Sequence, residues 1–184
     1  MSKTIIIPAQ EMFIPPDQFL YTKETHLKIE HSLVAISKWE SKWHVPFLDD
    51  KTEKTDEMMV DYIRCMTISQ NVDPEIYNII KLNADILKEI NEYINDPMTA
   101  TWFNDRNKSK GNKGEIVTSE LIYYWMFAQG IPLECEKWHL NRLMTLIRVC
   151  GEKNSPPKKM SRKENMAQIK ALNEARRKAY GTRG

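Results

Sequence analysis

Residues 118–150 read TSELIYYWMFAQGIPLECEKWHLNRLMTLIRVC and contain the longest uninterrupted apolar run of the chain, Leu121–Ala128. Thr118 or Ser119 can cap a helix over this run, and Gly130 is the residue type that ends one. Because the run leaves almost no polar face, we predict that this helix is central and buried. The run is far shorter than the roughly 18 to 20 apolar residues of a membrane span, so we expect no transmembrane helix.

The rest of this stretch predicts a second helix over Leu133–Cys150, begun by Pro132 and stopped by Gly151. Trp138 lies one turn before Arg142, a spacing that allows the indole ring to meet the guanidinium on the helix surface. The apolar stripe of this helix consists of Leu140, Leu143, Ile147 and Cys150.

Four segments with helical periodicity precede this stretch, at residues 31–42, 56–66, 73–82 and 86–94. The third has the clearest start, because Asp73-Pro74-Glu75 combines a capping side chain, a proline at the first helical position and a carboxylate near the positive end of the helix dipole. In the first segment, Trp39 and Trp43 extend the apolar stripe and are expected in the core. Polar loops are predicted at residues 49–54 and 104–114.

The N-terminal region has a different pattern. Thr4–Ile7 is rich in β-branched residues, and Phe19–Glu30 alternates in part between apolar and polar side chains, while Pro8 and Pro15-Pro16 mark turns. This pattern predicts a short hairpin or ribbon. The expected fold class is mainly α: a compact domain of about six to seven helices with a short N-terminal β element and a basic C-terminal helical arm.

Charge divides the chain into two parts. The formal net charge is +2, but residues 153–184 hold ten basic and two acidic residues, net +8, which leaves −6 for residues 1–152. Pro156-Pro157 resists helix at the join, so we predict an acidic helical body over residues 1–152 and a proline-hinged basic arm over 153–184. Ser161–Glu164 has the form of a capping box that would start a last helix, Arg162–Ala179.

The arm is the most distinctive feature of the sequence, and three interpretations compete for it. Its cations could contact nucleic-acid phosphates, its weak apolar stripe could bind a partner helix, or it could be a solubilising, partly disordered tail. The stripe consists of Met166, Ile169, Leu172 and Ala175. The candidate partner-binding residues are Lys158, Lys159, Arg162, Lys163, Arg176, Arg177 and Lys178.

Motifs for catalysis are missing from the sequence. It contains no nucleophile elbow, metalloprotease H-E-x-x-H, phosphate-binding glycine loop or dinucleotide fingerprint, so we expect no enzymatic activity and no cofactor. Cys135 and His139 lie four residues apart and could present two zinc ligands, with Cys65 or Cys150 completing the site. Because no second close pair exists, we expect them to be ordinary core or boundary groups and no metal to be bound.

Four blocks of the sequence resemble small proteins encoded in the tail-gene clusters of long-tailed bacteriophages and prophages. The blocks are SKWESKW at 37–43, MTATWF at 98–103, KWHLNRLMTLIRVC at 137–150 and PPKKMSRKE at 156–164. Such proteins resemble tail assembly chaperones, which are encoded between the major tail protein and the tape measure protein in the cluster. The resemblance implies a siphovirus-type morphogenesis protein that binds the tape measure protein or tail tube subunits in the bacterial host cytoplasm and is absent from the mature virion.

Two other functions stay open at this point. The basic arm is compatible with a nucleic-acid-binding or packaging accessory protein, although the acidic body and the single aromatic residue of the arm, Tyr180, favour this less. A structural virion component, such as a head-to-tail or tail completion subunit, is the other alternative.

Overall fold

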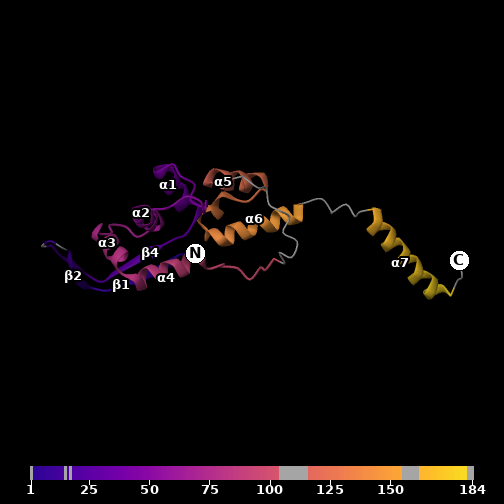
Figure 1. Ribbon diagram of the computed structural model, residues 1–184, viewed down its shortest axis with the longest axis horizontal. Helices are drawn as coiled ribbons and strands as arrows, with labels where there is room; N and C mark the ends of the chain where they lie inside the picture. The colour runs from indigo at the N-terminus through magenta and orange to yellow at the C-terminus, as the bar shows by residue number, and fades with distance from the viewer. Residues whose placement is uncertain (1, 15, 17, 104–115, 155–161, 182–184) are drawn as a thin grey trace. The chain divides into compact units, whose positions relative to one another are not determined.

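The computed structural model describes residues 2–14, 16, 18–103, 116–154 and 162–181 (Figure 1). The chain divides into two units, Met1–Gly151 and Glu152–Gly184. The loop predicted at residues 104–114 and the proline hinge at 156–157 lie outside the described residues.

One β-hairpin occupies the N-terminal region. Its strands are β1 (Lys3–Ile7), β2 (Gln10–Ile14), β3 (Gln18–Thr22) and β4 (Thr25–Ile29). β1 pairs with β4 and β2 with β3, both antiparallel and in one continuous register. Near the helices Ile5, Ile7, Leu27 and Ile29 are buried while the residues between them point outward. The predicted ribbon is therefore confirmed, because period-2 alternation places every second residue on the core face.

The described residues form seven α-helices, which confirms the mainly α prediction. They are α1 (Leu33–Trp43), α2 (Asp56–Met66), α3 (Glu75–Leu82), α4 (Ala84–Asn95), α5 (Ser119–Ala128), α6 (Leu140–Asn154) and α7 (Arg162–Tyr180). Local side chains set several boundaries. The Thr55 hydroxyl accepts a hydrogen bond from the Met58 amide, and the Asn83 side chain accepts from the first amides of α4. His44 ends α1 in the left-handed conformation, with φ 55°.

A single core joins the hairpin to the helices of the first unit. Trp39 of α1 and Tyr62 of α2 are its largest fully buried side chains. β1 packs on α4, and α1 packs on both α2 and α5 (Figure 1). Trp43, which was expected in the core beside Trp39, is only partly buried, and its indole N–H donates to the buried Asp61 carboxylate.

The prediction that α5 is a central, buried helix was wrong. Only Ser119, Ile122 and Met126 are buried, whereas Tyr124 and Phe127 are each 65% exposed. α5 packs on α1 along one side, so its apolar residues on the opposite side face solvent. An apolar sequence shows that a helix can be buried, but burial also needs neighbours on every side.

The prediction of one helix over Leu133–Cys150 was also wrong. Leu133–Lys137 forms a short 3-10 helix, η2, Trp138 is extended, and α6 then runs from Leu140 through Gly151 to Asn154. The chain is interrupted because the Leu140 amide donates to the His31 carbonyl at 2.9 Å and His139 forms a β-bridge with Ser32. Gly151 does not end the helix. None of the described helices is long and apolar enough to cross a membrane.

Candidate partner-binding surfaces

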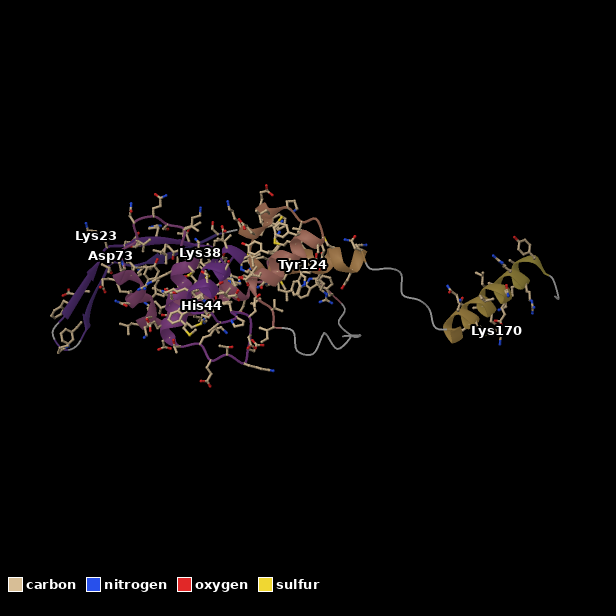
Figure 2. The ribbon with its side chains drawn as sticks, turned by 90° about the horizontal axis from the view of Figure 1, so that it is seen from above. Lys23, Lys38, His44, Asp73, Tyr124 and Lys170 are labelled. Atoms are coloured by element: carbon tan, nitrogen blue, oxygen red, sulfur yellow. The ribbon has the colours of Figure 1, made fainter. Side chains whose placement is uncertain are left out.

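Helix α7 carries all five of the predicted partner-binding residues that the structure describes. Every side chain described on it is exposed, including Arg176, Arg177 and Lys178. Figure 2 shows Lys170 of the same helix. Arg162 and Lys163 form its first turn, and Lys158 and Lys159 lie outside the described residues.

The predicted apolar stripe of α7 is present at the surface. Met166, Ile169 and Leu172 are more than half exposed and follow one another at helical spacing. Arg176 lies one turn beyond Leu172, so the stripe ends in a cation. Helix α7 is therefore a basic amphipathic helix whose apolar side chains are accessible to a partner.

A groove between α2, α3 and α4 is the second candidate surface. It encloses about 480 Å³. Leu82 and Met59 are its most exposed apolar side chains, 60% and 38% exposed. Its lining consists of Asp56, Met59, Val60, Tyr62, Ile63, Lys81, Leu82, Leu87, Ile90, Asn91 and Ile94. The lining is mainly apolar, and Asp56 pairs with Lys81 at 3.7 Å.

Sequence reasoning missed this groove, although one signal was available. Met58 and Met59 are adjacent, so their side chains leave the helix in different directions. Met58 is buried in the core, and Met59 turns toward the groove. The sequence alone could not locate the groove, because its walls come from three helices and no local sequence pattern shows how those helices pack.

A third apolar surface lies on α5 and η2. It includes the exposed side chain of Tyr124 (Figure 2). Phe127 of α5 is also exposed, and Leu133 of η2 is about half exposed. Exposed aromatic side chains are common at protein interfaces, since they offer a large contact area with little conformational freedom to lose.

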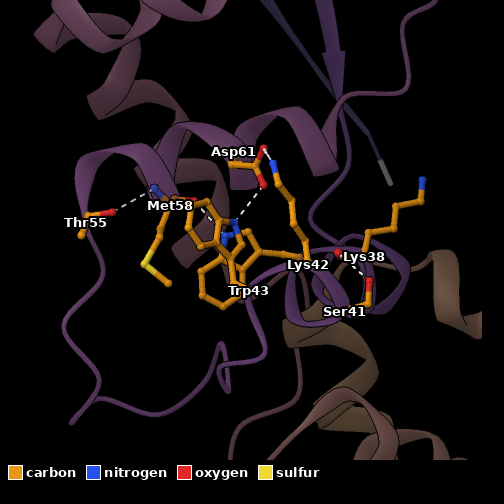
Figure 3. A network of polar contacts seen from close by, with 8 residues as sticks. Lys38, Ser41, Lys42, Trp43, Thr55, Met58 and Asp61 are labelled. Atoms are coloured by element: carbon orange, nitrogen blue, oxygen red, sulfur yellow. Dashed lines mark hydrogen bonds and ion pairs between the residues drawn. The ribbon is translucent and has the colours of Figure 1, made fainter.

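A polar network fixes the angle between α1 and α2 (Figure 3). The buried Asp61 carboxylate accepts from the Lys42 ammonium at 2.5 Å and from the Trp43 indole at 2.9 Å. The Trp39 indole donates to the Met58 carbonyl at 2.8 Å. Both indoles and the Lys42 ammonium donate to acceptors of α2, so the network ties α1 to α2.

The Cys65 thiol, which is half-buried beside this network, is poorly suited to catalysis. Burial and the nearby Asp61 carboxylate raise the pKa of the Cys65 thiol. A raised pKa keeps sulfur protonated at neutral pH, whereas a nucleophilic cysteine needs a thiolate.

The two buried histidines, His31 and His139, form the main titratable cluster in the interior. Their rings lie 4.9 Å apart between centroids. The His31 Nδ1 atom is 2.5 Å from the Tyr62 hydroxyl, and the His31 amide donates to the Tyr93 hydroxyl at 3.1 Å. Desolvation, with a smaller contribution from His139, lowers the pKa of His31 to about 3. Desolvation also lowers the pKa of His139.

His139 has a defined structural role. Its Nε2 atom lies 2.9 Å from the Tyr93 carbonyl and must carry the proton, since a carbonyl can only accept. Its Nδ1 atom then accepts from the Asn141 amide at 3.3 Å and caps the start of α6. Cys135 belongs to η2, so the helical pair considered for zinc does not form. In the described parts of the chain no three His, Cys, Asp or Glu side chains gather as a metal ion would require.

The expected contact on the surface of α6 is confirmed. The Arg142 guanidinium lies 4.3 Å from the centroid of the Trp138 ring. The interruption of the helix does not prevent this contact, because Trp138 directly precedes the capping residue of α6.

The geometry defines a class before any relative is considered: a helical body with an apolar groove, together with a basic amphipathic helix. Comparisons with protein-family models, with curated proteins and with solved structures found no match. Function must therefore be argued from these surfaces.

Proposed function

We propose that the protein is a non-enzymatic tail assembly chaperone of a long-tailed bacteriophage. It would bind the tape measure protein, the major tail protein or both during tail morphogenesis in the host cytoplasm and be left out of the finished virion. The observation that supports this most is the exposure of α7, whose apolar stripe and cations are accessible wherever its side chains are described.

The physical basis is protection of apolar helices before assembly. A long helical tape measure protein would aggregate unless its apolar stripes were covered until tail tube subunits polymerise around it. Body helices would cover those stripes, and the arm would make a second contact, since a cationic segment accelerates encounter with an acidic partner. Neither contact requires a cofactor, a metal or a membrane.

Removal of the arm tests this proposal. Deletion of residues 155–184 leaves α6 intact, because α6 ends at Asn154. We expect infectious tail yield to fall when this variant replaces the full chain, while the far-ultraviolet spectrum of the body keeps its helical form. Substitution of Arg176, Arg177 and Lys178 by Gln is the matched control for charge alone. Unchanged tail yield with the deletion would remove the arm from the mechanism.

Nucleic-acid binding is the second candidate, favoured by the net charge of +8 on residues 153–184. Binding that depends on released counterions weakens steeply with salt, whereas binding through apolar stripes does not. Titration against duplex DNA and against a helical tape measure fragment at increasing salt separates the two functions. Stoichiometric protein in purified virions would instead favour a structural head-to-tail or tail completion subunit.

A further inference from the structure

We propose that the groove between α2, α3 and α4 receives a positively charged amphipathic helix of a partner protein. The inference deepens the proposed function by giving the chemistry of the segment that the body holds, and it rests on that function only for the identity of the protein that supplies the helix.

The lining of the groove requires an apolar occupant. Leu82 and Met59 are exposed large apolar side chains, and Leu87 and Ile94 of α4 line the same space. Covering such side chains removes apolar surface from water, which favours a complex. Helix-in-groove recognition places side chains of the i, i+3, i+4 and i+7 positions into a surface of this kind.

The charge of the three helices selects the sign of the occupant. Residues 56–95 contain eight acidic and three basic residues, net −5. Two cations from outside this range, Lys42 and Lys3, pair with Asp61 and Glu89 and reduce the negative charge left on this surface to −3. Two of the three cations are already engaged: Lys81 pairs with Asp56, and the Arg64 guanidinium lies 5.0 Å from the Tyr77 ring centroid. A cationic helix therefore complements this surface, whereas an acidic helix of equal hydrophobicity is repelled.

A small metabolite fits the groove less well than a helix. Small-ligand pockets use a few convergent polar groups to orient the ligand. Here Asp56 and Lys81 neutralise each other, and the Tyr62 hydroxyl is bonded to His31 in the interior. Asn91 is the remaining polar side chain of the lining. An apolar wall without an orienting cluster suits a periodic row of side chains.

Two designed peptides test the inference with the full-length protein. The peptide LKKLLKLLKKLLKL is a cationic amphipathic helix, and LEELLELLEELLEL has the same leucine pattern with opposite charge. Fluorescence anisotropy of labelled peptides would measure both dissociation constants. We expect the lysine peptide to bind at least about tenfold more tightly at about 50 mM salt, with the difference shrinking at about 500 mM as screening increases.

Matched variants locate the binding surface. Leu82→Asn changes an exposed side chain at the groove, and Ile6→Asn makes a comparable change at a similarly exposed aliphatic side chain of β1 outside the groove. We expect Leu82→Asn to weaken binding of the lysine peptide by about tenfold, the scale of losing a contact of 1.4 kcal/mol. Ile6→Asn should leave it unchanged. Circular dichroism of both variants verifies that the fold is kept.

Three results would overturn the inference: equal affinity for both peptides at low salt, equal weakening by both substitutions, or no effect of Leu82→Asn in a folded protein. A parallel measurement with a tape measure fragment separates this inference from the proposed function. Retained fragment binding beside a failed peptide test refutes the groove alone. Lost fragment binding beside a successful peptide test refutes the tail assembly role alone.

Discussion

Protonation of His31 should make folding strongly dependent on pH. His31 is buried beside His139 and has a pKa of about 3 in the folded chain, against an ordinary value of 6.5. The unfolded chain therefore binds a proton below pH 6.5 that the folded chain refuses. Stability from this group is complete above the unfolded pKa and is lost as the pH falls from 6.5 toward 3.

The size of the effect follows from the two pKa values. About pH 5 lies about one and a half units below the ordinary histidine pKa, and each unit is worth 1.36 kcal/mol. Protonation of His31 in the unfolded chain alone therefore lowers the free energy of unfolding by about 2 kcal/mol relative to about pH 7.5. The lowered pKa of His139 acts in the same direction. Its protonation on Nδ1 would also abolish the cap that it provides to the Asn141 amide.

The assay is urea denaturation at about pH 5 and about pH 7.5. The slope of the unfolding free energy against urea concentration should not change, which checks two-state behaviour. His31→Gln keeps a polar group near the Tyr62 hydroxyl and cannot titrate. We expect this variant to be less stable at neutral pH but to lose about 2 kcal/mol less than the parent on acidification. His26→Gln, at an exposed histidine, is the control and should keep the parent's dependence. An unchanged pH dependence in His31→Gln would refute the reasoning.

Three further predictions concern other parts of the first unit. Asp61→Asn weakens the acceptor shared by the Lys42 and Trp43 donors of α1, and it should lower the free energy of unfolding in urea by about 1–3 kcal/mol. An unchanged free energy of unfolding would mean that the contact is worth no more than a surface ion pair. Met126→Ala should destabilise the protein by about 2–5 kcal/mol, while Phe127→Ala should change stability by less than about 1 kcal/mol; similar losses would contradict the one-sided burial of α5. The Cys65 thiol should react slowly with a disulfide reagent at neutral pH and accelerate only above its ordinary pKa, so rapid modification of the native protein at neutral pH would contradict its raised pKa.

Helix positions were predictable wherever the signal was local. The Thr118 hydroxyl caps α5 as expected, and the acidic first turn of α2 begins at Asp56. Hydrogen bonds within a helix join residues four apart, so periodicity and capping residues carry enough information to place it. The hairpin followed from alternation for the same reason, since its side chains repeat every second residue.

The candidate surfaces were predictable only in part. The cations and apolar stripe of α7 could be listed from the sequence because every described side chain of that helix is exposed and no packing choice intervenes. The groove and the histidine cluster could not, because each joins side chains from several elements. His31 lies between β4 and α1, yet its partners Tyr62 and His139 belong to distant segments.

The sequence by itself determined the helical content, the N-terminal ribbon and the contrast of charge between residues 1–152 and 153–184, because these depend on neighbouring residues and composition. Only the tertiary structure decided that α5 is exposed on one side and that the chain is interrupted before α6. Both outcomes depend on which residues, distant in the sequence, pack against these two segments. At His139 a hydrogen bond from Leu140 to the His31 carbonyl replaces one that a continuous helix would have made, and local periodicity cannot reveal that competing partner.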